Sequence, residues 1–137
     1  MGYVFQFGVV WDHLPELLDG AWLTLRLSVS AFVLGLLLAV LLAYARAYGP
    51  PAVRGPVVVY IEFMRNTPLL VQLFVLYFSL PAIGVRLDAN GAALLGLALN
   101  FAGDGAEILR GGMLAVAHGQ IEAATALGLR RWRVFRH

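Results

Sequence analysis

The chain has 137 residues, of which 61% are hydrophobic and only 13% are charged, and its mean hydropathy is +0.80. A soluble domain carries about 25% charged residues, and one of this size has too little interior to bury so much apolar surface. The absence of cysteine excludes disulfides and thiol chemistry. Together these properties predict a membrane protein.

The first 20 residues are predicted to form an extracytoplasmic N-terminus. They contain three acidic residues and no lysine or arginine, unlike the basic start of a cleavable signal. A first spanning helix is predicted over residues 21–45, because residues 27–45 carry no charge and about 20 apolar residues cross a hydrocarbon core of about 30 Å. Gly35 and Ala39 lie four residues apart, and they either mark a close approach of another helix or are a chance pair.

The second hydrophobic segment, residues 57–80, begins with polar residues at a depth where charge is costly. These residues are Glu62, Arg65, Asn66, Thr67 and Pro68. The spacing of three predicts an ion pair between Glu62 and Arg65, either at a functional site within the membrane or as an interfacial structural pair. Pro68 is predicted to kink the helix or to start a new one, with Asn66 or Thr67 as its cap.

The third segment, residues 91–117, also contains polar residues within or at the end of an apolar run. These are Asn100, Asp104, Glu107 and Arg110. Glu107 and Arg110 again lie three apart, which predicts a structural ion pair. Gly111 and Gly112 follow and are predicted to loosen the helix.

Three spans place the two chain ends on opposite sides of the membrane. Arginines gather in the loop after the first span and from Arg110 onward. The positive-inside rule therefore places the N-terminus outside and the C-terminus in the cytoplasm. The same rule accounts for the basic charge of the chain without a nucleic-acid partner.

The last stretch, residues 118–137, holds the most specific pattern. Its residues are Glu122, Ala123, Ala124 and Gly128. They resemble the start of the cytoplasmic coupling loop of ABC importer permeases, whose signature begins Glu-Ala-Ala and has a glycine four residues after the second alanine. The pattern has a physical reason, because a short helix that docks in a groove needs small side chains, a carboxylate can pair with the partner, and a glycine can end the helix.

Further motifs resemble one branch of that family, the binding-protein-dependent type I importers of polar and charged amino acids (histidine, glutamate, glutamine, arginine and opines). The residues that carry this resemblance are Arg65, Asn66, Thr67, Pro68 and Gln72 in the second segment and Asn100, Glu107, Arg110 and Gly111 in the third. The resemblance implies an all-α membrane fold with three of the normal five core helices, ending in the coupling loop.

The resemblance also implies the function, which is that of a membrane-spanning permease subunit of an ATP-driven amino-acid importer in the bacterial inner membrane. Its implied partners are an ABC ATPase, a second permease subunit that is the same or different, an extracytoplasmic solute-binding protein and lipid, with no cofactor. The residues 122–124 and 128 would couple to the ATPase. The candidate pathway residues are Asp104, Asn100, Glu62 and Arg65.

Asp104 departs from the family pattern, which usually reads Gly-Ala-Tyr where this chain reads Ala102-Gly103-Asp104. An intramembrane carboxylate could hold a substrate ammonium or a basic side chain, or it could be a damaging substitution. The chain also ends within the coupling loop, so the 137 residues alone are not expected to transport a solute.

Other classes of protein fit less well. The chain has no Gly-x-x-x-x-Gly-Lys-Ser/Thr loop for ATP, and His13, His118 and His137 are too scattered for a metal site, so no enzyme is predicted. One alternative is a truncated, non-transporting membrane fragment or small membrane interaction protein. The other is an ion-coupled secondary transporter using Asp104 and Glu62, which would usually show paired inverted halves.

Overall fold

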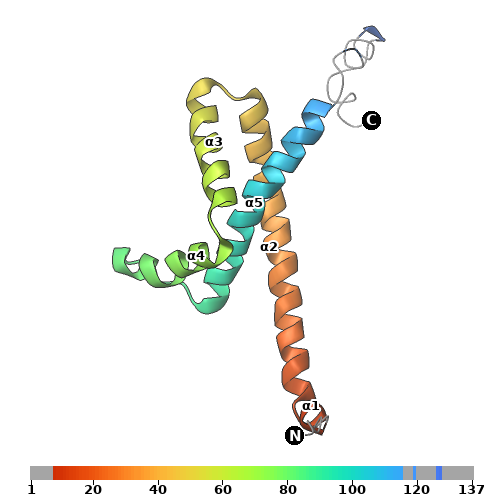
Figure 1. The fold of residues 1–137 in the computed structure, drawn as a ribbon, viewed down its shortest axis with the longest axis vertical. Helices are drawn as coiled ribbons and strands as arrows, with labels where there is room; N and C mark the ends of the chain where they lie inside the picture. Colours follow the sequence, from red (N-terminus) through yellow and green to blue (C-terminus); the bar gives the residue numbers. More distant parts are fainter. Residues whose placement is uncertain (1–7, 116–118, 120–125, 128–137) are drawn as a thin grey trace, which may run out of the picture.

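The computed structural model describes residues 8–115, 119 and 126–127 (Figure 1). The elements in this part of the chain are helical: α1 (Gly8–Asp12), α2 (Leu14–Tyr48), α3 (Pro51–Asn66), α4 (Leu69–Phe74), the π-helical turn η1 (Val75–Ser79), the 3-10 turn η2 (Leu80–Ile83) and α5 (Ala89–Ala115). No strand occurs among them, and the predicted all-α fold class is confirmed.

Helix α2 runs along the long axis of the molecule (Figure 1). Its 35 residues correspond to about 52 Å at 1.5 Å per residue, which exceeds the hydrocarbon thickness of about 30 Å. A proline in the first turn is tolerated there because the first N–H groups have no intrahelical partner. The predicted span 21–45 lies within this helix, which also includes residues 14–20 of the segment assigned to the N-terminus.

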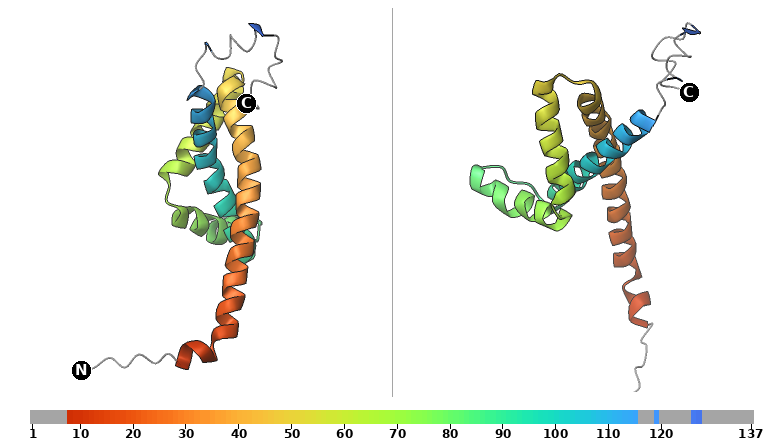
Figure 2. Two further views of the ribbon diagram at one scale, coloured as in Figure 1. Left: turned by 90° about the vertical axis from the view of Figure 1, so that its right-hand side faces the viewer. Right: turned by 45° about the horizontal axis from the view of Figure 1, so that its top comes forward.

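Helix α5 crosses α2, and the two make the most extensive helix contact in the described structure (Figure 2). The buried residues of α2 are all small: Ala31, Gly35, Ala39 and Ala43. A Cβ atom on Gly35 would lie 2.8 Å from the carbonyl oxygen of Ala98 in α5. A Cβ atom on Gly105 would lie 3.0 Å from Cβ of Ala39. The interpretation of Gly35 and Ala39 as a site of close helix approach is therefore confirmed.

Helix α3 completes a small core between the three helices. Ile61 is fully buried and clusters with Ala39, Ala43 and Ala106, so one side chain of α3 fills the space left by alanines of α2 and α5. Because the buried residues of α2 and α5 are alanine and glycine, the helices can pack closely without a large apolar core.

The predicted segment 57–80 is sharply bent. Its two parts, α3 and the run from α4 to η2, meet at an angle of 107°, and α4 points away from the bundle (Figure 1). The predicted break at Pro68 is confirmed, but the predicted cap is wrong. Pro68 itself precedes α4 and no side chain caps that helix. Asn66 Nδ2 instead donates to the Glu62 carbonyl oxygen at 2.7 Å, and Thr67 N–H donates to the Phe63 carbonyl oxygen. Both residues therefore make their hydrogen bonds at the C-terminal end of α3.

Two helices, α2 and α5, are long and apolar enough to cross a membrane, and the bent pair makes a third span if it counts as one. Helix α5 starts two residues before the predicted segment 91–117 and continues through Gly111 and Gly112 to Ala115. The helix is therefore not broken at these glycines, and the predicted loosening stays a prediction. The predicted coupling residues Glu122, Ala123, Ala124 and Gly128 lie outside the described residues.

Candidate functional site

Glu107 of α5 is the centre of an ion-pair network between helices. Its carboxylate accepts hydrogen bonds from Arg46 Nη1 of α2 at 2.6 Å and from Arg110 Nε at 3.1 Å. Arg46 Nη2 also lies 3.8 Å from Glu62 Oε1 of α3. Two guanidinium groups thus balance two carboxylates, which lowers the cost of placing charge beside lipid. The network ties the last turn of α2 to α3 and α5.

The predicted Glu107–Arg110 pair is confirmed, whereas the participation of Arg46 was missed. The Arg46 side chain is only 16% exposed, compared with 27% for Arg110. No spacing rule relates residue 46 to residue 107, because the contact depends on how α2 and α5 cross. The one available signal is that a basic residue at the end of a long apolar helix needs a partner.

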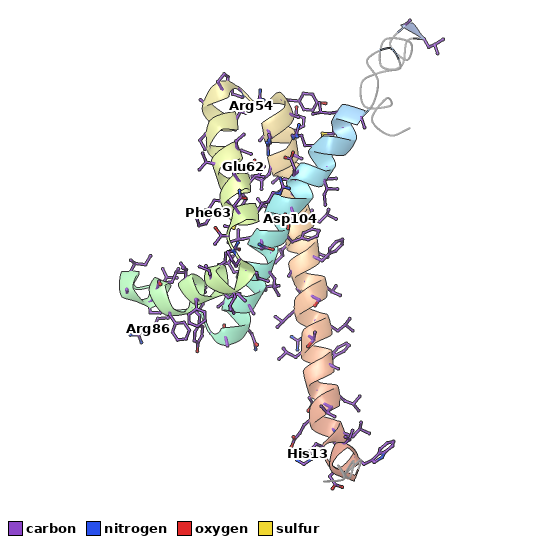
Figure 3. All side chains as sticks on the ribbon, in the orientation of Figure 1. His13, Arg54, Glu62, Phe63, Arg86 and Asp104 are labelled. Carbon is purple, nitrogen blue, oxygen red and sulfur yellow. The ribbon has the colours of Figure 1, made fainter. Side chains whose placement is uncertain are left out.

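The predicted Glu62–Arg65 pair is wrong, because each residue takes a partner on another helix. Glu62 faces Arg46, and Arg65 Nε lies 3.4 Å from Asp104 Oδ1 of α5. Helix α3 contacts both α2 and α5, and opposite charges on those helices replace the weak attraction between neighbours on one helix. The site therefore joins three helices, as the positions of Glu62 and Asp104 in Figure 3 illustrate.

Asp104 lies on the accessible side of α5, with 55% of its side chain exposed. Its neighbours on both sides are buried glycines. A Cβ atom on Gly103 would lie 2.9 Å from Met64 Cβ in α3, and one on Gly105 would lie 3.0 Å from Ala39 Cβ in α2. The glycines bring α5 close to both helices while the carboxylate between them stays open. The contact with Arg65 fits a carboxylate that holds a basic side chain.

Polar side chains also gather at the break between α3 and α4. Gln72 is 7% exposed, and its Nε2 donates to the carbonyl oxygens of Met64 at 3.0 Å and Thr67 at 2.9 Å. Asn100 Nδ2 of α5 lies 3.4 Å from the same Met64 oxygen. Asn100 was predicted as a pathway residue and Gln72 as a structural one. In the structure both amides bind the main chain.

Tyr60 was missed by the sequence analysis. Its hydroxyl donates to the carbonyl oxygen of Leu99 at 2.9 Å and adds a further link between α3 and α5. A partly buried tyrosine usually finds such a partner, so the residue type was a signal, but the partner could not be named from the sequence.

No group of three or more His, Cys, Asp or Glu side chains within residues 8–115, 119 and 126–127 is placed to hold a metal ion. The site consists of guanidinium, carboxylate and amide groups between apolar helices. Such an arrangement can hold helices together and can present charge to a polar solute. It defines an α-helical membrane protein with a polar interior junction.

Residues 31–137 match the family described as the binding-protein-dependent transport system inner membrane component, and the chain belongs to this family. The resemblance to importer permeases is therefore confirmed. Among similar proteins, the probable amino-acid ABC transporter permease protein YckA of Bacillus subtilis (strain 168) is 38% identical over 134 residues, which are 98% of this chain and 59% of that protein.

The glutamine transport system permease protein GlnP of Escherichia coli (strain K12) is 36% identical over 135 residues, covering 97% of this chain and 62% of that protein. A crystal structure described as an amino acid ABC transporter with histidines aligns with a TM-score of 0.87 and 33% identity, over 98% of this chain and 63% of that one. The chain thus spans about three fifths of the length of these relatives.

Proposed function

We propose that this chain is part of the membrane-spanning permease subunit of an ATP-driven amino-acid importer. The observation that carries the proposal is the family match over residues 31–137. The descriptions of YckA and GlnP as amino-acid and glutamine permeases support an amino-acid cargo. The permease itself is not an enzyme in this proposal, and ATP is hydrolysed by a separate subunit.

The family description also supports the partners and the location. The description names a binding-protein-dependent transport system, and we expect the chain to work with an extracytoplasmic solute-binding protein and an ABC ATPase. A second permease subunit, identical or different, would complete the pathway. The proposed location is the bacterial inner membrane, with the N-terminus outside and the C-terminus in the cytoplasm.

The proposed coupling element comprises Glu122, Ala123, Ala124 and Gly128. We expect Glu122→Ala in the complete permease to reduce co-purification of the ATPase at least tenfold, because the variant lacks the carboxylate that pairs with the partner. Glu16→Ala, at an exposed position in the first turn of α2, is the matched control and should retain the ATPase. If both variants retain the ATPase, the proposed coupling role of Glu122 is contradicted.

Within the membrane, Asp104 and Arg65 are the proposed substrate contacts. Both side chains are about half exposed, with 55% and 42% accessible. An amino acid carries an ammonium group and a carboxylate, which complement this acid and this base. Asn100 and Glu62 also belong to the proposed pathway, although the amide of Asn100 already binds the main chain and Glu62 already faces an arginine.

Uptake into liposomes separates this proposal from its alternatives. The complete permease, assembled with its ATPase and solute-binding protein, should import labelled polar amino acids only when ATP is enclosed inside the liposomes, on the side of the ATPase. Uptake that follows a proton or sodium gradient without ATP would indicate a secondary transporter instead. If co-expression of residues 1–137 lowers transport by the complete permease, the chain acts as an interaction fragment.

A further inference from the structure

At the break between α3 and α4, Pro68 deprives one main-chain oxygen, that of Met64, of its helical donor. In a continuous helix, the carbonyl of Met64 would accept a hydrogen bond from the N–H of residue 68. Residue 68 is proline and has no N–H. Inside a bilayer, water does not replace the missing donor, so the oxygen needs a partner from the protein.

Two side-chain amides supply this donor from different elements. Gln72 Nε2 of α4 lies 3.0 Å from the Met64 oxygen, and Asn100 Nδ2 of α5 lies 3.4 Å from it. Gln72 Nε2 also donates to Thr67, whereas its Oε1 is buried without a hydrogen-bond partner in the described structure. The amide therefore uses both hydrogens and leaves its acceptor unused. Its orientation is set by the need for donors at the end of α3.

Close packing holds the donors in place. A Cβ atom on Gly96 of α5 would lie 2.5 Å from Leu73 Cδ2, so the last turn of α4 lies directly on α5. Gln72 is adjacent to Leu73 in sequence, and Asn100 is one turn beyond Gly96. Three elements, α3, α4 and α5, thus meet at a single carbonyl oxygen.

We propose that Gln72 and Asn100 form a bend latch, which holds α4 at 107° to α3. Pro68 disfavours a straight helix because it has no N–H, and the bend latch stabilises the bent conformation. The two amides are positioning residues that make the span a rigid corner instead of a free hinge. This role goes beyond the proposed function, because it concerns the conformation of the span whatever solute is carried.

Spin-label distances in the complete permease, assembled with its partners in liposomes, test the bend latch. Residues 1–137 contain no cysteine, and any cysteine elsewhere in the complex is first replaced by serine. Cysteines introduced at Val53 in α3 and Ile83 in η2, which are 46% and 78% exposed, then give defined label sites. Thirty residues of straight helix would separate the two positions by roughly 45 Å, whereas a bend of 107° between arms of about 21 Å gives about 25 Å.

Four variants in this labelled background give different expected distances. Gln72→Glu keeps the shape but places acceptors against two carbonyl oxygens, and Gln72→Met removes the donors. Both should at least double the width of the distance distribution. Pro68→Ala alone should keep the short distance, because the bend latch remains. Pro68→Ala with Gln72→Met should shift the distance toward the straight value, because the N–H restored at position 68 completes the helix.

The matched control is Asn90→Asp, an exposed amide in the first turn of α5, which should leave the distribution unchanged. A Gln72 variant with the parental width would overturn the proposal, as would straightening by Pro68→Ala alone. If the Gln72 variants do not assemble, Asn100→Ala is measured instead: broadening supports the bend latch and an unchanged width overturns it. The distances are measured without transport, so a failed uptake assay does not affect this test.

Discussion

Glu107 and Asp104 are two carboxylates three residues apart on α5, but their surroundings differ. Glu107 is 21% exposed and is held by two guanidinium groups. Asp104 is 55% exposed and has one arginine at 3.4 Å. An exposed pair contributes little to stability because water screens it, whereas a partly buried carboxylate leaves its cations unpaired when it is removed. The two residues should therefore respond differently to neutralisation.

We expect Glu107→Gln to lower the free energy of unfolding by about 1–3 kcal/mol, between the values for exposed and fully buried pairs. The reason is that Arg46 and Arg110 lose their shared carboxylate. Thermal unfolding of the complete permease in detergent would measure this as a lower Tm. Glu16→Gln, on an exposed turn, serves as control and should not change the Tm. Equal Tm values for both variants would show that the network contributes nothing.

Asp104→Asn should have the opposite profile. Its stability cost should stay below about 1 kcal/mol, since the pair with Arg65 is half exposed. If Asp104 holds the ammonium of the substrate, the variant should raise the KM for uptake at least tenfold, with a smaller change in kcat. Arg65→Gln should raise the KM as well. Unchanged uptake kinetics in both variants would leave the pair with a structural role only.

At the scale of elements, α2 and α5 associate through small residues. Lipid tails are as apolar as leucine side chains, so burial from water does not drive this contact, and close van der Waals packing must. The buried positions on α2 recur every four residues from Ala31 to Ala43. The buried residues of α5 are likewise alanine and glycine. The small side chains thus allow the close van der Waals contact that holds the two helices together.

We expect Gly35→Ala to destabilise the helix pair by about 1–3 kcal/mol, because the added methyl group would lie 2.8 Å from a backbone oxygen that cannot move alone. Gly20→Ala has open space around its Cβ position and should stabilise α2 slightly through helix propensity. Tm values in detergent should therefore change in opposite directions for the two variants. A rise in Tm for both would contradict the close contact.

For the whole molecule, large apolar side chains remain exposed along the helices, such as Leu37 and Leu41 on α2, while the charge network lies between helices. This distribution suits a bilayer, where apolar side chains meet lipid and charges meet each other. If the bent pair is one span, we expect the two connections, before α3 and before α5, to lie at opposite membrane surfaces.

A test of orientation follows from the positive-inside rule. A single cysteine at Val85, before α5, should react with a membrane-impermeant maleimide added outside intact cells. A single cysteine at Val53, beside Arg54 at the start of α3, should react only after the cells are opened. Both residues are exposed, with 45% and 46% of their surface accessible. The reverse pattern of labelling would place the N-terminus in the cytoplasm.

Features that are local along the chain could be predicted from the sequence. An apolar run of sufficient length predicts a span, a proline without an N–H predicts the break at residue 68, and a spacing of three predicts the Glu107–Arg110 pair. Family membership could also be predicted from the sequence, because the motifs of the family are short patterns of residues in a fixed order. None of these inferences requires knowing which helices are neighbours.

Contacts between distant residues were decided only by the tertiary structure. Arg46 pairs with Glu107 across 61 positions, and Asn100 reaches the oxygen of Met64 across 36. These partners depend on how α2, α3 and α5 cross, and the crossing depends on where glycines let the backbones approach. The same geometry redirected Glu62 and Arg65 from each other to partners on other helices, because an interhelical charge lay closer than the neighbour along the chain.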